Sequence, residues 1–157
     1  MICKDVGMLE IRSILAPADF SAHDVAAIRY AVGLAERFGA TLHLLHVLPD
    51  VIPAGPDAMV APGLPPAYYR EAEADSHEAL GRLLDPTWGR VTTVETSVRW
   101  GELVEGVVAY AKEHAIDLIV VATHGRTGLG HALLGSAAER IVREAPCPVL
   151  TIRDRSV

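Results

Sequence analysis

The sequence has few cysteines, no excess of basic residues and no long apolar run. Only Cys3 and Cys147 occur among 157 residues, and their number and separation fit neither a disulfide framework nor a common metal motif. This usage is typical of a reducing compartment, so we expect a cytoplasmic protein. The apolar runs are no longer than a strand, far short of the roughly 20 residues of a membrane span. The first residues lack the apolar segment of a signal peptide, and we expect no membrane association.

The charge argues against another class of function. The formal net charge is −6, whereas general nucleic-acid binding requires a basic face. We therefore expect no nucleic-acid partner. The same charge disfavours long-range attraction of a polyanionic ligand, so any phosphate site must act through groups close to the ligand.

Strand-like and helix-like segments alternate along the chain. Short apolar runs rich in Val and Ile predict strands, and apolar residues at helical spacing predict helices. The expected strands are residues 11–16, 41–47, 91–100, 118–122 and 149–152. The expected helices are residues 22–38, 67–84, 102–114 and 137–144. This alternation predicts a single α/β domain over residues 1–157, with a five-stranded parallel sheet and helices on both faces.

The residue pattern within the strands predicts their order in the sheet. The third strand alternates apolar and polar residues, and the fifth is short and preceded by proline, so both suit sheet edges. The compatible order is 3-2-1-4-5. This order reverses between the first and fourth strands, and ligands of open α/β sheets bind at such a point, beyond the carboxyl ends of the strands.

Local signals predict the helix ends and inner faces. Capping boxes are expected from Ser21 with Asp24 and from Ser136 with Glu139. The residues expected to face inward are Val25, Ile28, Val32 and Ala35 in the first helix, Tyr69, Ala72, Leu80 and Leu83 in the second, Val104, Val107, Val108 and Ala111 in the third, and Ile141 and Val142 in the last. Residues 49–66 are rich in proline and glycine and predict a long loop, for which a functional lid and a tolerated insertion both fit.

Residues 117–139 carry the strongest functional signal. They read DLIVVATHGRTGLGHALLGSAAE: a buried strand, a loop with four glycines, then a helix N-terminus. Glycines let backbone N–H groups approach an anion, and the first helical turn adds unpaired N–H groups and a positive dipole end. We predict an anion site here; a mobile loop before an ordinary helix is the alternative.

The spacing of this loop differs from two common phosphate motifs. His131 and Ala132 stand where a Walker-type loop requires Lys and Ser or Thr. Leu133 stands where a dinucleotide fingerprint has its third glycine. The loop also follows the fourth strand, whereas the dinucleotide fingerprint follows the first.

Three segments and their spacing form a specific set. They are ILAPADFSAHDVAAIRYA, the HVL after the second strand, and DLIVVATHGRTGLGHALLGSAAERIVREAPCPVL. Over nearly its whole length the chain resembles the universal stress proteins. In ATP-binding members of that family the loop reads Gly-x2-Gly-x9-Gly-Ser/Thr; here Gly125, Gly135 and Ser136 match, and Ala122 replaces the first glycine.

The resemblance implies a fold like that of the adenine nucleotide alpha hydrolases and a regulatory role in stress responses, with ATP as ligand, with or without Mg²⁺. It implies that adenine and ribose lie against the ends of the first two strands and that the triphosphate lies on the loop and the last helix. The binding residues so implied are Pro17, Asp19, Val47, Ala122, Thr123, His124, Gly125, Arg126, Thr127, Gly128, Gly135, Ser136, Ala137 and Ala138.

Several of these residues also have a structural interpretation. Asp19 can accept hydrogen bonds from ribose or adenine, or it can cap the first helix. Arg126 can pair with phosphate or remain an exposed loop charge, and Ser136 can both cap its helix and bind phosphate. His124 can donate to a phosphate, but a single loop histidine is more often structural or solvated.

Metal binding and fast catalysis are not expected. His43 and His46 lie three residues apart on a strand and so face opposite sides. His124 and His131 have no cysteine or suitably spaced carboxylate nearby. The loop also contains no evident general base.

Three hypotheses follow. The first is a regulatory ATP-binding protein. The second is an interaction protein of the same family that binds no nucleotide, which Ala122 favours and Gly125, Gly135 and Ser136 disfavour. The third is a slow ATP hydrolase or an adenylyl-transfer relative. The resemblance also implies a homodimer formed through residues 149–152, whose strand is expected to be an open edge.

Overall fold

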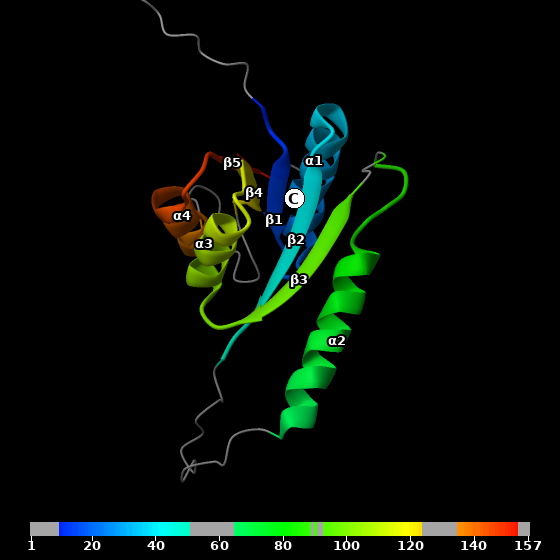
Figure 1. Cartoon of the computed structure of the whole chain (residues 1–157), viewed down its shortest axis with the longest axis vertical. Helices are drawn as coiled ribbons and strands as arrows, with labels where there is room; N and C mark the ends of the chain where they lie inside the picture. Colours follow the sequence, from blue (N-terminus) through cyan, green and yellow to red (C-terminus); the bar gives the residue numbers. More distant parts are fainter. Residues whose placement is uncertain (1–9, 51–64, 89, 91–92, 124–134, 154–157) are drawn as a thin grey trace, which may run out of the picture.

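Strands and helices alternate throughout the part of the chain that the structure describes. The computed structural model describes residues 10–50, 65–88, 90, 93–123 and 135–153. Figure 1 shows the arrangement of the elements. The elements are β1 (Ser13–Pro17), α1 (Ala22–Phe38), β2 (Thr41–Leu48), α2 (Pro66–Arg82), β3 (Val94–Trp100), α3 (Leu103–Glu113), β4 (Leu118–Ala122), α4 (Ser136–Glu144) and β5 (Val149–Ile152).

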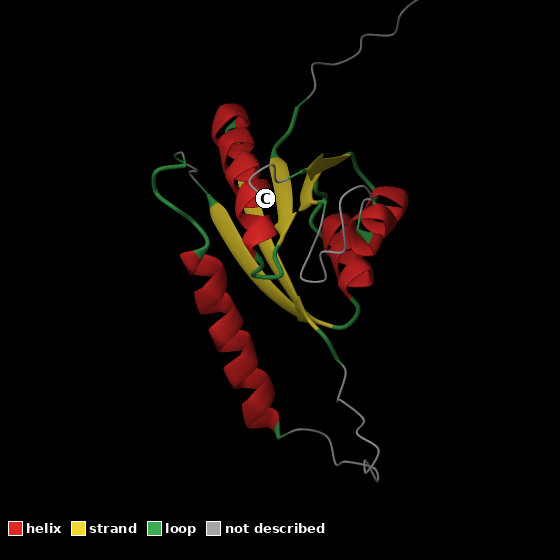
Figure 2. Ribbon diagram, turned by 180° about the vertical axis from the view of Figure 1, so that it is seen from behind, coloured by secondary structure: helices red, strands yellow, loops and turns green. Residues whose placement is uncertain are grey.

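The five strands form one sheet of order β3-β2-β1-β4-β5, with every neighbouring pair parallel (Figure 2). The predicted order and the α/β class are confirmed. The edge positions of β3 and β5 are confirmed as well. Both edges have weakly buried strands: β3 has no fully buried residue, and Leu150 of β5 is 36% exposed.

The sheet divides between its two central strands. The register of β1 with β2 runs the full length of β1, from Ser13 to Pro17. The register of β1 with β4 ends at the pair Leu15 and Ile119, although β4 continues to Ala122. The carboxyl ends of β1 and β4 therefore separate, and they do so at the predicted switch point.

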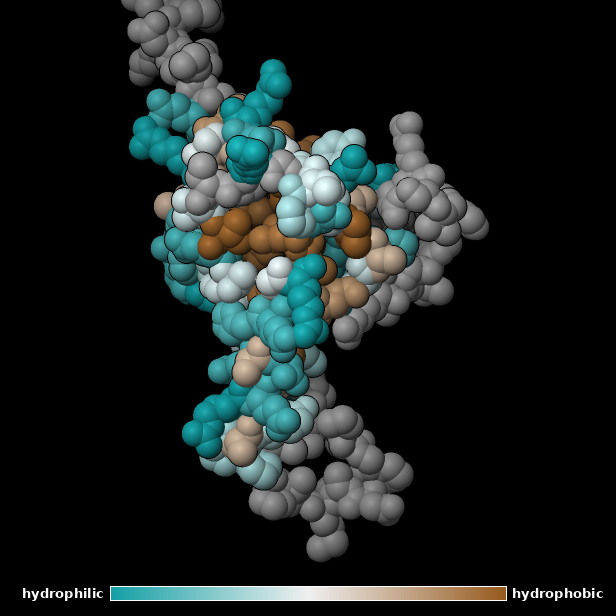
Figure 3. Space-filling model, turned by 90° about the vertical axis from the view of Figure 1, so that its right-hand side faces the viewer, coloured by the Kyte–Doolittle hydropathy of each residue, from teal (hydrophilic) through white to brown (hydrophobic). Residues whose placement is uncertain are grey.

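Helices cover both faces of the sheet. Alternate side chains of a strand point to opposite faces; Ile14 and Leu44 pack in the core with α1, and Leu15 and Leu45 pack in the core with α3 and α4. Leu80 of α2 belongs to the α1 core. Figure 3 views the side on which α1 and α2 lie and shows apolar surface bordered by hydrophilic residues.

The inner faces of two helices differ from the prediction. Val25 of α1 is 43% exposed and Val142 of α4 is 47% exposed, so their inward assignments are wrong. In α1 the buried face consists of Asp24, Ala27, Ile28, Ala31, Val32 and Ala35. These positions follow the i, i+3, i+4 spacing of one helical face, and Val25 lies off it.

The predicted inward residues of α3 are all buried. In α2 Leu80 is fully buried, whereas Tyr69, Ala72 and Leu83 are half-buried.

Both predicted capping boxes are wrong in detail. Ser21 is the N-cap of α1, but its side chain makes no capping hydrogen bond. Gly135, not Ser136, is the N-cap of α4, and Glu139 pairs with Arg143 at 2.6 Å. The cap that does form is at α3, where Glu102 accepts a hydrogen bond from the backbone N–H of Glu105 at 2.9 Å.

The two histidines of β2 face opposite sides of the sheet, as predicted. Nδ1 of His43 lies 3.0 Å from the hydroxyl of Tyr110 on α3, and Nδ1 of His46 lies 2.7 Å from the carbonyl oxygen of Ala18. Among the described residues no group of three or more His, Cys, Asp or Glu is arranged to hold a metal ion.

Burial of His43 gives the fold a predicted sensitivity to acid. Burial lowers the pKa of His43, and the nearby charge of Glu95 only partly opposes this. The unfolded chain then takes up a proton before the folded one as the pH falls through about 6.5, so the free energy of unfolding decreases. His43→Gln lacks this contribution, so we expect its free energy of unfolding to rise relative to that of the wild type as the pH falls from 7.5 to 5.5 in urea titrations. His77→Gln, an exposed change on α2, serves as the control, and equal slopes for wild type and His43→Gln would contradict the prediction.

Candidate functional site

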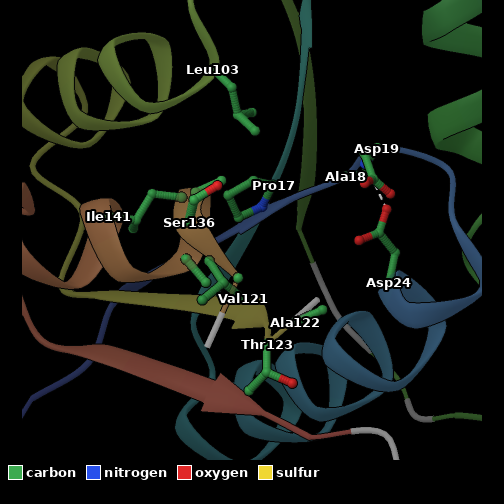
Figure 4. Close-up of a pocket in the computed structure, with 13 residues that line it drawn as sticks. Pro17, Ala18, Asp19, Asp24, Leu103, Val121, Ala122, Thr123, Ser136 and Ile141 are labelled. Atoms are coloured by element: carbon green, nitrogen blue, oxygen red, sulfur yellow. Dashed lines mark hydrogen bonds between the residues drawn. The ribbon is translucent and has the colours of Figure 1, made fainter. Parts of the chain in front are cut away.

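A cleft opens where β1 and β4 separate. It has a volume of about 310 Å³, and Figure 4 shows the side chains around it. The described residues that line it are Pro17, Ala18, Asp19, Asp24, Leu103, Val121, Ala122, Thr123, Gly135, Ser136, Ala137, Ala138 and Ile141. The residues come from β1 and the loop after it, from α1, α3 and β4, and from the start of α4.

Most of the predicted site residues in the described part of the chain surround this cleft. Those that line it are Pro17, Asp19, Ala122, Thr123, Gly135, Ser136, Ala137 and Ala138. Val47 does not; it lines a second cleft of about 390 Å³ that shares Ala18, Asp19 and Leu103 with the first. The predicted residues His124, Gly125, Arg126, Thr127 and Gly128 lie outside the described residues.

The start of α4 contributes backbone donors to the first cleft. The N–H of Gly135 donates to the carbonyl oxygen of Thr123 at 2.7 Å, which ties the beginning of α4 to the end of β4. The first N–H groups of a helix have no partner within the helix. The N–H groups of Ser136, Ala137 and Ala138 belong to that turn. Together with the positive end of the helix dipole they form an arrangement that favours an anion.

The turn between β1 and α1 carries two carboxyl groups. The N–H of Asp19 donates to Oδ2 of Asp24 at 2.5 Å, and the N–H of Ser21 donates to Oδ1 of Asp19 at 2.8 Å. Phe20 between them has a φ of 62°, in the left-handed region that residues other than glycine rarely adopt. The N-cap of α1 is Ser21 and not Asp19; Asp19 accepts a hydrogen bond from the N–H of that N-cap residue.

Asp24 is a functional candidate that the sequence did not indicate. It is 5% exposed. Burial, followed by the hydrogen bond and the negative charge of the Asp19 carboxyl group, raises the pKa of Asp24 to about 7. The sequence pattern places it in a capping box with Ser21. One signal could have indicated that Asp24 is buried. It lies three residues before Ala27, on the inward face of α1.

Apolar side chains form another wall of the first cleft. Leu103, Val121 and Ile141 line it, and Val121 and Ile141 are also part of the core between the sheet, α3 and α4. Arg140 of α4 pairs with Glu102, the N-cap of α3, at 3.1 Å, which links the two helices. The site therefore combines an apolar wall, a set of backbone donors and two acids, a composition that suits an amphipathic ligand with an anionic end.

The second cleft adjoins the first across Asp19. Phe20, His46 and Val47 line it from the β1–α1 turn and β2, and Asp75 and Ser76 line it from α2. The rings of Phe20 and His46 lie 4.4 Å apart between centroids. This aromatic pair beside an apolar valine offers a surface on which a planar ring could stack.

The family of the chain follows from its match to a known family model. The model of the universal stress protein family matches residues 10–153. The chain belongs to the universal stress protein family. Its relatives include the universal stress protein MJ0531 of Methanocaldococcus jannaschii, which is 31% identical over 90% of this chain and 82% of its own length. A universal stress protein of Thermus aquaticus is 32% identical over 90% of this chain and 98% of its own length.

Solved structures of the family share the fold. The universal stress protein UspA from Lactobacillus plantarum matches with a TM-score of 0.67 and 27% identity, covering 92% of this chain and 99% of its own. Two more distant members were crystallised with nucleotides. One, in complex with cAMP, has a TM-score of 0.61 and 19% identity over 92% of this chain and 98% of its own. The other, from Archaeoglobus fulgidus in complex with dAMP, has a TM-score of 0.56 and 18% identity over 92% and 99%. At such identities these two establish likeness of fold alone.

None of the helices in the described ranges is long and apolar enough to span a bilayer.

Proposed function

We propose that this universal stress protein is a cytoplasmic regulatory protein that binds an adenine nucleotide, ATP with or without Mg²⁺, in the cleft between β1 and β4. One observation carries the proposal. The cleft opens at the switch point of the sheet and is lined by the first turn of α4, where backbone donors meet an apolar wall. The nucleotide complexes of two proteins of the same fold support the choice of ligand class.

In this proposal the two clefts divide the ligand between them. The adenine ring lies toward Val47 in the second cleft, and Asp19, shared by both clefts, accepts hydrogen bonds from the ribose or the base. The phosphates lie on the backbone of Ala122 and Thr123 and on the first turn of α4. Residues 124–128 complete the phosphate site by resemblance to the family pattern. Hydrogen bonds to a charged group contribute roughly 1.5–3 kcal/mol each, so a few backbone contacts and a buried ring suffice for micromolar affinity.

Calorimetric titration with ATP tests the proposal. We expect a one-to-one complex, and we expect nucleotide to be released when the freshly purified protein is heated. An absence of bound nucleotide together with an absence of binding heat at millimolar ATP would overturn the proposal. That result would instead favour the second hypothesis, an interaction protein of the same family that binds no nucleotide. The replacement of a motif glycine by Ala122 supports that hypothesis. Phosphate release above background that depends on Asp19 or His124 would indicate a slow hydrolase.

The outer edge of β5 is proposed to pair with a second copy of the chain. Ile119 and Thr123 donate to the carbonyl oxygens of Pro148 and Ile152. Backbone groups of a strand alternate in direction, so the N–H groups of Val149 and Thr151 point away from β4. An open edge of this kind is a template for another strand, and we propose antiparallel pairing with the same edge of a twofold mate.

We expect a Thr151→Pro variant to be monomeric. Proline removes the outward N–H that the second copy would use, but it removes no hydrogen bond to β4, because that N–H does not face β4. Light scattering would measure the mass, and circular dichroism would verify the fold. Thr151→Val, which keeps the N–H, is expected to remain dimeric. A Thr151→Pro variant that stays dimeric would exclude this edge as the interface.

A further inference from the structure

The two carboxyl groups at the mouth of the cleft form a pair with unequal surroundings. Asp24 is buried in the inner face of α1, and Asp19 lies half-buried on the turn that leads into it. The backbone N–H of Asp19 donates to Oδ2 of Asp24 at 2.5 Å, so the two acidic residues are in direct contact. Two carboxyl groups so placed disfavour the ionisation of both at once. Figure 4 shows the pair on one side of the cleft.

The other described residues that line the cleft with Asp24 are uncharged, except Asp19. On its own element the neighbouring titratable group is His23, and the turn contributes Asp19. From β4 and α4 the polar side chains that line the cleft are Thr123 and Ser136, which are uncharged. Arg153, which follows β5, is exposed. Burial and Asp19 raise the pKa of Asp24 into the neutral range, and the backbone N–H groups of Asp19 and Phe20 oppose this only in part.

We propose that Asp24 makes nucleotide binding pH-dependent: in its ionised form it adds a second negative charge to the cleft beside Asp19 and weakens the binding of polyphosphates. This inference rests on the proposed nucleotide site and adds to it a residue that sets its charge. Asp24 does not need to touch the ligand. It acts through the charge of the cleft.

The chemistry sets the direction of the effect. At pH 6, below the pKa of Asp24, the pair carries one negative charge. At pH 8 both groups are ionised, and like charges close together repel each other and the phosphates. By reciprocity, the bound polyanion favours the protonated form, so binding of ATP is accompanied by uptake of a proton.

The test compares the affinity for ATP of three proteins between pH 6 and pH 8 by calorimetry. They are the wild type, Asp24→Asn, which keeps the shape and hydrogen bonds of the neutral acid, and Glu36→Gln, which makes the same change of charge at the exposed far end of α1. ATP itself titrates in this range, but the ratio of two dissociation constants cancels its contribution. We expect the dissociation constant of the wild type for ATP, divided by that of Asp24→Asn, to rise about five- to tenfold from pH 6 to pH 8. The same ratio of wild type to Glu36→Gln should stay constant. Both ratios should also stay constant when uncharged adenosine replaces ATP.

A second measurement does not depend on the variant. Carbon NMR of the wild-type carboxyl groups should show Asp24 titrating near neutral pH, with its midpoint moved upward by ATP. A constant ratio for ATP, or an Asp24 resonance that titrates near 4, would overturn the inference while leaving the nucleotide site intact. Failure of all three proteins to bind ATP at any pH would overturn the proposed function, and the pH-dependent binding with it.

Discussion

A Gly135→Val variant is expected to bind ATP about 100-fold more weakly than the wild type and to keep its fold. Gly135 is the N-cap of α4 and lines the cleft between β1 and β4. Its φ of −59° and ψ of 147° are open to any residue, so valine is compatible with the backbone. The N–H that donates to Thr123 is retained, since valine has one too.

The expected loss of affinity follows from the place of Gly135 on the cleft of about 310 Å³. Two added methyl groups beside the first turn of α4 are expected to separate a phosphate from the helix N–H groups. Losing one or two hydrogen bonds to a charged group costs about 2–4 kcal/mol, which corresponds to a factor of about 100 in the dissociation constant.

The matched control is the same substitution at Gly33. Gly33 lies in α1, and an added Cβ would meet no atom within 4 Å. We expect Gly33→Val to bind ATP as the wild type does. Calorimetry provides the affinities and circular dichroism verifies the fold. Unchanged affinity in Gly135→Val would show that the first turn of α4 does not hold the phosphates.

An Asp24→Asn variant is expected to be about 2–4 kcal/mol more stable than the wild type at pH 8 and about equally stable at pH 4. The folded pKa of Asp24 is about 7, compared with an ordinary value of 3.8. The folded state therefore binds the proton more tightly than the unfolded state. As the pH rises from about 4 to about 7, stability is lost at about 1.4 kcal/mol per unit, which amounts to about 4 kcal/mol above pH 7.

Asparagine removes this penalty because it has no charge to bury. It forfeits the favourable position of an acid in the first turn of a helix, an effect of about 0.3–1 kcal/mol, so the net change remains stabilising. Urea unfolding at pH 4, 6 and 8 measures the difference, and Glu36→Gln serves as the control for charge on the same helix. A wild type and an Asp24→Asn variant whose stabilities run parallel with pH would contradict the assignment of a neutral Asp24.

The sheet and the place of the cleft could be predicted because both depend on strong signals. Apolar strand runs fix which strands are internal, and a parallel sheet of this order has one switch point. The phase of the helices was harder to predict. In α1 the sequence draws attention to Val25, but the buried face contains Ala27, Ala31 and Ala35. Small residues let a helix lie close to a sheet, and a pattern based on large apolar residues overlooks them.

The details of the site depend on competition between local partners, which the sequence does not reveal. Asp24 has the spacing of a capping residue from Ser21, but its carboxylate accepts from the N–H of Asp19, and the N–H of Ser21 donates to Asp19. The resemblance implies Val47 beside Pro17, yet Val47 opens onto the neighbouring cleft, because β2 continues beyond β1 along the sheet. The turn that brings Asp19 to Asp24 includes a left-handed Phe20, which no residue pattern indicated.

β1 ends at Pro17, where it has separated from β4, and proline suits this position chemically. Ala18 donates to Leu45 of β2, so by alternation the nitrogen of Pro17 faces β4. An amide hydrogen at that position would be left without an acceptor where the strands part, or would draw Val120 toward it and lengthen the ladder. An imino acid has no such hydrogen. The chain thus has one orphaned donor fewer where its central strands part, and the entrance to the cleft is in part a property of the backbone itself.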